Sequence, residues 1–127
     1  GIAQLPHLDK DNAYRRQIAS WYDQLLMPHN DKITFITTPE GCESARHLYQ
    51  IMIDDRDGLM TYLNEHEIYP GVHYVDNTQY RMYAYAAGTC PKASYASDHL
   101  LSLPMHMRLT YEDVKFVAQC IINYLNK

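Results

Sequence analysis

Apolar residues recur along the chain with two different spacings, and these spacings predict where helices and strands lie. Between about Asp11 and Met27 apolar residues recur every four positions, which predicts a helix that ends before Pro28. A second helical pattern follows Thr110 and Asp113, which together make a capping signal for the last helix. Its apolar residues are Val114, Val117, Ala118, Ile121 and Leu125.

The two-residue period of a strand occupies the middle of the chain. From Arg46 to Ile53 both faces are apolar, which predicts a central strand covered on both sides. One face carries Tyr49, Ile51 and Ile53, and the other carries Leu48 and Met52. Shorter strand candidates are Ile33 to Ile36, Gly71 to Val75, and Leu100 to Leu103.

Two shorter helices are predicted between the strands. Asp54 or Asp55 can cap one of them, and Pro91 fits the first turn of another that ends near Asp98. The resulting order predicts an α+β fold with a small, mostly antiparallel sheet packed against helices. No linker interrupts it, so residues 1–127 are predicted to form a single domain, with Asp76 to Thr89 as a functional or mobile loop.

The composition of the chain argues against nucleic acid and membrane as partners. The 127 residues are 46% hydrophobic and carry a formal charge of -4 without a basic stripe, so no nucleic acid partner is expected. No apolar run approaches the ~20 residues of a membrane span, and Gly1 to Lys10 has no signal-peptide pattern. Three cysteines without a paired spacing predict free thiols. We therefore expect a cytoplasmic protein with no membrane contact.

Candidate chemistry is sparse. The seven histidines show no metal-binding spacing, so no metal site is expected, and no hydrolase or nucleotide-binding motif occurs. The chain alone therefore offers no catalytic residues. Six of its twelve tyrosines fall between Tyr69 and Tyr95, a composition that suits an interface or a ligand wall.

His73 and Tyr74 are the pair of greatest interest. On a strand they would point to opposite faces, so only one could enter the core while the other met solvent or a ligand. From spacing alone we favour a structural histidine beside a packed tyrosine.

A series of motifs in fixed order changes this interpretation. It contains Arg56-Asp57-Gly58-Leu59, Gly71-Val72-His73-Tyr74 and Ser102-Leu103-Pro104-Met105. Flanking matches are Arg15-Arg16, Tyr22, His47-Leu48-Tyr49, Leu109-Thr110 and Asp113-Val114. The series resembles the C-terminal part of DegT/StrS-type sugar-nucleotide aminotransferases, which are much longer enzymes that use pyridoxal phosphate.

The resemblance implies a C-terminal small domain of a fold-type-I aminotransferase. Its partners would be a large domain that binds pyridoxal phosphate, a nucleotide-sugar substrate, and a second subunit in a homodimer. The Schiff-base lysine lies in the large domain, so this chain is expected to bind no cofactor and to be inactive alone. His73 would position the nucleotide sugar, with Tyr74 as a weaker substrate-binding candidate.

Two departures from the family pattern bear on these expectations. The His-Tyr motif usually continues with a proline and a second histidine, but here Val75 and Asp76 follow, which leaves the substrate preference open. Glu67 replaces the glycine that usually ends the preceding helix. A left-handed cap there would cost on the order of 1 kcal/mol, so a different turn before Ile68 is expected.

Two other functional classes stay open at this point. One is a non-catalytic binding or assembly module that contacts protein or carbohydrate through the tyrosine-rich loop. The other is an independent small enzyme with an unrecognised site.

Overall fold

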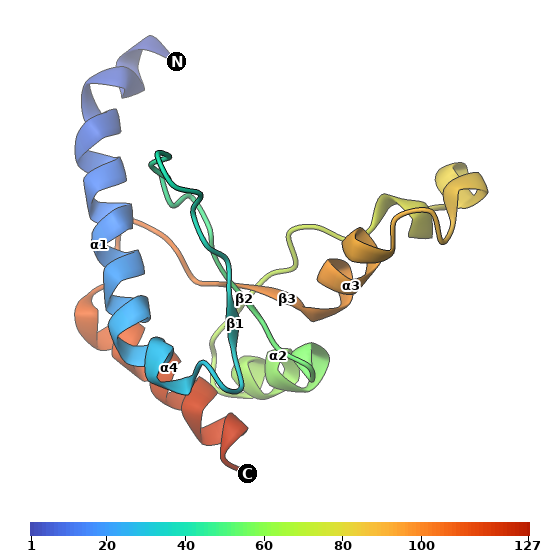
Figure 1. Cartoon of the computed structure of the whole chain (residues 1–127). Coiled ribbons are helices and arrows are strands. Elements are labelled where there is room, and N and C mark those ends of the chain that lie inside the picture. Colours follow the sequence, from blue (N-terminus) through green and yellow to red (C-terminus); the bar gives the residue numbers. More distant parts are fainter.

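The chain folds into four α-helices and a three-stranded antiparallel sheet, described over residues 1–127 by a computed structural model (Figure 1). The helices are α1 (Leu8–Leu26), α2 (Arg56–Glu65), α3 (Pro91–His99) and α4 (Tyr111–Leu125). The strands are β1 (Thr34–Phe35), β2 (Tyr49–Met52) and β3 (Leu100–Leu103). Helices α1 and α4 pack together on one side of the sheet, and α3 lies on the opposite side of the molecule (Figure 1). The predicted α+β class is confirmed.

Helix α1 starts earlier than its apolar stripe predicts. A 3-10 helix over Ile2–His7 runs directly into it, so no break in the backbone marks the predicted start near Asp11. Asp9 and Asp11 lie in the first turn, where carboxylates favour the positive end of the helix dipole. The helix ends at Leu26, immediately before Met27 and Pro28, close to the predicted end.

The central position predicted for the second strand is confirmed. Strand β1 pairs with β2 through Phe35 and Ile51, and β3 pairs on the other edge through Leu101 and Ile51. Tyr49 and Ile51 are buried, whereas the opposite face of β2 is only half-buried. The regular strand is also shorter than Arg46 to Ile53, because Arg46 has a left-handed φ of 51° that interrupts the extended backbone.

The caps of α2 and α4 follow the predicted residues. Asp55 accepts a hydrogen bond from the Gly58 amide at 3.1 Å, which satisfies one of the free N–H groups of α2. At the start of α4 the Thr110 amide donates to Asp113 at 2.8 Å, and the Asp113 amide donates to the Thr110 hydroxyl at 3.3 Å. This reciprocal pair is a complete capping box.

Helix α2 ends in a left-handed turn on Glu67, so the different turn expected before Ile68 is not seen. Glu67 has a φ of 60°, a value that glycine adopts freely and other residues rarely do. The Ile68 amide donates to the Leu63 carbonyl at 3.0 Å and the Glu67 amide donates to Asn64 at 3.1 Å. Burial of Ile68 against the core accompanies these bonds and offsets the strain on Glu67.

The prediction of a strand over Gly71 to Val75 is wrong beyond its first residue. Gly71 and Ser102 exchange both backbone hydrogen bonds, at 2.9 and 2.8 Å, as an isolated antiparallel bridge. Beyond Gly71, side chains form the hydrogen bonds to the backbone groups of this segment in place of a neighbouring strand. Gln50 donates to the His73 carbonyl at 2.8 Å, and the Asp76 amide donates to the Ser97 hydroxyl at 2.9 Å. These bonds direct the backbone away from the sheet.

Tyrosine hydroxyls tie α1 to the rest of the core. Tyr22 donates to the Pro104 carbonyl at 3.0 Å, and Tyr14 donates to the Leu109 carbonyl at 2.7 Å. Tyr49 on β2 stacks on Tyr22 with 4.8 Å between ring centroids and donates to Asp23 at 2.7 Å. Burial raises the pKa of both Tyr22 and Tyr49, so these hydroxyls stay protonated and remain donors.

Substituting Glu67 tests the cost of its left-handed backbone. Glu67→Gly should raise the free energy of unfolding by roughly 0.5 to 1 kcal/mol, because relief of the strain exceeds the extra chain entropy of glycine. Glu67→Ala is the matched control and should leave stability nearly unchanged or lower it. Urea unfolding of the three proteins measures the difference, and a destabilised Glu67→Gly protein would contradict a strained cap.

Candidate functional site

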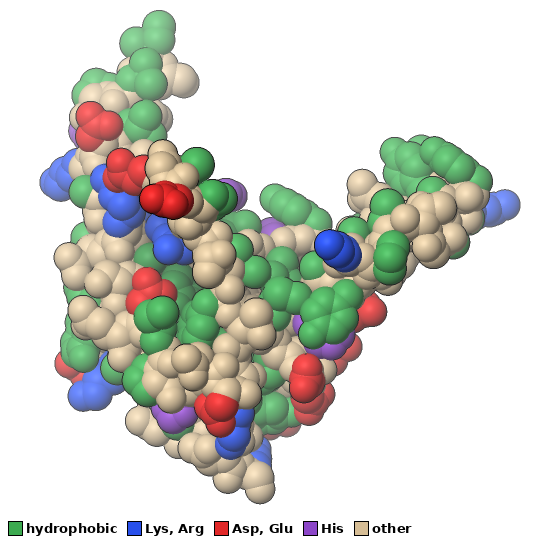
Figure 2. Space-filling view, viewed as in Figure 1, with side chains coloured by type: hydrophobic (Ala, Val, Ile, Leu, Met, Phe, Trp, Pro, Cys, Tyr) green, Lys and Arg blue, Asp and Glu red, His purple; other side chains and the backbone are tan.

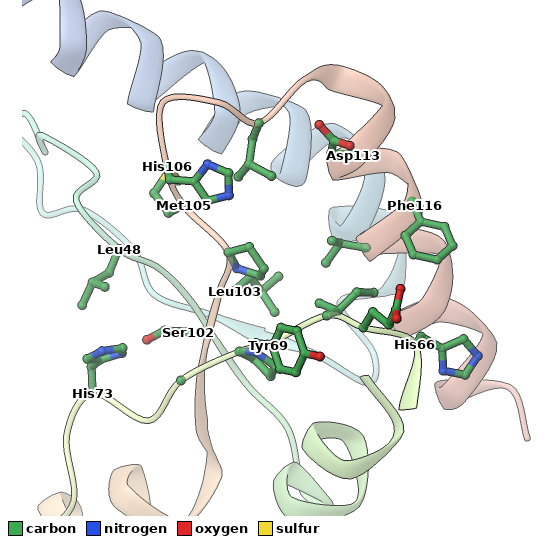
Figure 3. A pocket seen from close by; sticks show the side chains of 17 residues that line it. Leu48, His66, Tyr69, His73, Ser102, Leu103, Met105, His106, Asp113 and Phe116 are labelled. Atoms are coloured by element: carbon green, nitrogen blue, oxygen red, sulfur yellow. The ribbon is translucent and has the colours of Figure 1, made fainter. Parts of the chain in front are cut away.

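A groove of about 780 Å³ runs between helix α4 and the edge of the sheet (Figure 3). Its walls come from residues 66–71 and 73, residues 102–106, and residues 109, 113, 116 and 117, together with Leu48 on the other side. Leu103, Met105 and Phe116 supply apolar wall, and polar side chains such as His106 and Asp113 lie among them. His73 and Ser102 mark one end in Figure 3, and His66 lies toward the other. The mixed lining suits a ligand that has both apolar and polar parts.

A side chain of β2 fixes the backbone of His73, and the missing side chain of Gly71 leaves space for its ring. The Gln50 amide holds the His73 carbonyl, as described above. A Cβ atom placed on Gly71 would lie 2.6 Å from His73 Cε1, so the ring occupies the space that a side chain at residue 71 would need. The ring lines the groove, yet its Nδ1 atom is buried and has no hydrogen-bond partner. An unpaired buried nitrogen of this kind calls for a functional explanation.

Tyr74 does not line the groove. Its ring stands at 89° to that of His73, and 76% of the residue is exposed to solvent. It borders a smaller pocket beside α3 and not the groove. The two residues therefore diverge, as the sequence predicted, although the segment that carries them is not a strand. Of the predicted substrate-binding pair, only His73 faces the groove.

Ser102 is a site residue that the sequence interpretation missed. In the sequence, Ser102 stands out only as part of the motif Ser102-Leu103-Pro104-Met105. The serine is 3% exposed, borders the groove and has a hydroxyl without a partner. The signal was present in the sequence, because Ser102 is the one polar residue in the otherwise apolar strand Leu-Leu-Ser-Leu. A hydroxyl buried among leucines needs a partner or a role.

The carboxylate of Asp113 gives the upper edge of the groove a negative charge. The Thr110 amide and hydroxyl donate to Asp113, and with nearby His106 they hold the pKa of this carboxyl below its usual range. Asp113 therefore stays ionised well below neutral pH. Its hydrogen bonds belong to the cap of α4, which anchors this wall of the groove.

No lysine borders the groove. Lys32 donates to the Leu125 carbonyl, Lys115 pairs with Glu112, and Lys127 lies over the Tyr62 ring. Lys10 borders a different pocket, and Lys92 lies on α3. No three metal-ligating side chains are gathered at one place. None of the helices combines the length and the apolarity that crossing a membrane requires.

The predicted irregular segment forms an arm that extends away from the body of the fold (Figure 1). Two 3-10 helices, Asn77–Gln79 and Arg81–Ala86, build it. Apolar side chains cover its tip (Figure 2). Met82 is 73% exposed and Tyr85 is 85% exposed, with Tyr80 and Tyr83 also open to solvent. Such a concentration of aromatic surface is typical of a contact face.

Comparison with known proteins agrees with the motifs and with the fold. The DegT/DnrJ/EryC1/StrS aminotransferase family matches residues 1–122. UDP-N-acetyl-3-dehydro-alpha-D-glucosamine 3-aminotransferase of Acidithiobacillus ferrooxidans is 31% identical over 94% of this chain and 32% of its own length. UDP-4-amino-4,6-dideoxy-N-acetyl-beta-L-altrosamine transaminase of Campylobacter jejuni is 29% identical over the whole chain and 35% of its own length.

Solved structures give the same result. The aminotransferase TlmJ of Streptoalloteichus hindustanus matches with a TM-score of 0.90 and 29% identity, over 99% of this chain and 35% of that one. The chain belongs to the DegT/DnrJ/EryC1/StrS aminotransferase family, which confirms the resemblance seen in its motifs. Enzymes of this family depend on pyridoxal phosphate. This chain spans about a third of the length of the relatives it matches.

The exposed arm predicts that the isolated 127-residue chain self-associates. Replacing Met82 and Tyr85 together by serine should shift the chain toward monomer, because these side chains make up much of the apolar tip. Sedimentation velocity measures the shift. The matched control replaces Ile2 and Leu5, which are 87% and 62% exposed at the opposite end of the molecule. A monomeric wild-type chain would contradict this prediction. So would a shift toward monomer in the control variant alone.

Proposed function

We propose that this chain is the small domain of an aminotransferase that transfers an amino group, from glutamate, to a keto-sugar on a nucleoside diphosphate. The complete protein would be a cytoplasmic homodimer in amino-sugar or polysaccharide biosynthesis. Family membership supports the reaction class, and the relatives named above act on UDP-linked sugars by their names. The observation that carries the proposal is the groove with an unpaired imidazole nitrogen of His73 at one end.

In this proposal the groove forms one wall of the substrate cleft, and the large domain forms the other. His73 donates or accepts one hydrogen bond to the nucleotide sugar and so fixes the position of the sugar. Leu103, Met105 and Phe116 cover apolar parts of the ligand and keep water away from the reacting carbon. The chain thus contributes binding and orientation, while the proton transfers are made by residues outside it.

Pyridoxal phosphate, when bound in the complete enzyme, carries the amino group between donor and sugar. The residues of this chain do not by themselves fit that group, because no lysine borders the groove. The lysine and the phosphate-binding groups are therefore assigned to the large domain. That domain is the main partner we propose for this chain.

The tyrosine-rich arm supports a second candidate function. Exposed aromatic side chains at its tip suit contact with a protein or a carbohydrate, which would make the chain a non-catalytic binding module. The two functions differ in where substitutions act. Loss of nucleotide-sugar turnover after changes in the groove favours the aminotransferase, and loss of assembly alone after changes in the arm favours the module.

Cofactor trapping tests the division of labour between the two domains. After incubation of this chain with pyridoxal phosphate and reduction with borohydride, intact mass should show no stoichiometric adduct, because its lysines lie away from the groove. A family member that contains both domains serves as the positive control. Full occupancy at one site, mapped to a single lysine of this chain, would refute the assignment.

Replacing His73 in the complete enzyme tests its role in substrate binding. His73→Ala should lose roughly 1 to 3 kcal/mol of transition-state stabilisation in the sugar half-reaction, because one hydrogen bond to the ligand is removed. The glutamate half-reaction should change much less. Single-turnover kinetics separate the two.

The matched control is His29→Ala, which lies just after α1 and outside the groove. It should leave both half-reactions unchanged. Equal losses in both halves for His73→Ala would indicate a structural histidine, and no loss in either would remove it from the site.

A further inference from the structure

Three residues lie in one row across the sheet beside His73. Gln50 on β2 is directly opposite Ser102 on β3, and Ser102 in turn forms the bridge with Gly71. Residues directly opposite each other in antiparallel pairs extend their side chains from the same face of the sheet. Gln50, Ser102 and the side-chain position of Gly71 therefore share one face. It is the face opposite the buried Tyr49 and Ile51.

The imidazole of His73 occupies the side-chain position that Gly71 leaves free. His73 Nδ1 lies 3.3 Å from the place where a Cβ of residue 71 would be. In a pair that exchanges both backbone hydrogen bonds, opposite Cβ atoms are about 5 Å apart. The ring is thus the cross-strand neighbour of the Ser102 side chain. Figure 3 shows the serine oxygen directed toward the ring.

His73 Nδ1 and Ser102 Oγ are the two buried side-chain polar atoms that have no hydrogen-bond partner. Both residues line the groove and lie at neighbouring positions across the bridge, so a side-chain rotation that brings Ser102 Oγ to His73 Nδ1 would give both atoms a partner. The direction of the bond follows from counting hydrogens. If the hydroxyl donates to Nδ1, no buried hydrogen is left unpaired, whereas the reverse bond would leave the serine hydrogen without an acceptor.

We infer that Ser102 is a positioning residue for His73: its hydroxyl donates to Nδ1 and places the ring proton on Nε2, while Gln50 holds the main chain. The role in binding rests on the proposed function of the groove. Because Nε2–H is then a donor, the ligand must present an acceptor oxygen there. A phosphate or a sugar oxygen of a nucleoside diphosphate sugar meets this requirement.

The first test reads the ring directly, without any substrate. Ring-15N-histidine labelling of the full-length protein that carries this chain, with His73→Gln to assign the signal, reports which nitrogen holds the proton. At about pH 8.5, above the usual titration range of imidazole, His73 should be predominantly the Nε2–H form. Ser102→Ala should shift it toward a mixture of both forms, and Ser102→Thr, which keeps a hydroxyl, should restore it.

An Nδ1–H form in the wild type would overturn the inference, as would a proton distribution that Ser102→Ala leaves unchanged. If the added methyl of threonine disturbs the strand, Gln50→Glu provides a second arm. It removes the amide donor to the His73 carbonyl and should broaden or shift the His73 signal. No change of the signal in that variant would overturn the part assigned to Gln50.

The second test measures binding and separates this inference from the proposed function. UDP-N-acetylglucosamine serves as the probe, and Ser102→Ala should weaken its binding roughly 3- to 10-fold, as expected for a misdirected hydrogen bond. His29→Ala should not change it. If the proton distribution behaves as expected but neither Ser102→Ala nor His73→Ala affects binding, the positioning stands and the proposed substrate role of the groove fails.

Discussion

The whole fold depends on covering one face of a very small sheet. Three short strands are not stable in water unless an apolar face is buried against other elements. Tyr49, Ile51, Leu101 and Leu103 form that face, and all are 3% exposed or less beneath α1 and α4. Burial of each such side chain contributes roughly 1.5 to 3 kcal/mol relative to exposure. The two helices are therefore part of the sheet's stability and not an addition to it.

This packing also sets the walls of the groove. The hydroxyls of Tyr22 and Tyr14 hold the carbonyls of Pro104 and Leu109, at both ends of the segment that joins β3 to α4. That segment contributes Met105 and His106 to the groove. Burial raises the pKa of Tyr22, so its hydroxyl stays protonated and remains the donor to Pro104. These two bonds fix both ends of an irregular segment that forms part of the groove wall.

Much of this architecture could be predicted because it depends on local patterns. The stripe of α1, the capping box of α4 and the central position of β2 follow from apolar spacing and from Thr110 and Asp113. The prediction failed at Gly71 to Val75, where β-rich composition suggested a strand. There the side chains of Gln50 and Ser97, which are distant in sequence, form hydrogen bonds with the backbone of His73 and Asp76. No local sequence pattern indicates such bonds. Ser102 does leave a local signal, as the one polar residue of β3, but its place beside Gly71 depends on a bridge between distant parts of the chain.

Gly71 has a consequence for how sequence variants of such proteins are interpreted. A larger residue at this position would meet the imidazole of His73 at 2.6 Å, while the backbone bonds to Ser102 could still form. The histidine ring would be expelled from its place although the core remained intact. Abundance assays would score such a variant as normal, and an alignment would still show the histidine. A substitution at Gly71 would then remove any ligand contact that the His73 ring makes, although His73 itself is unchanged.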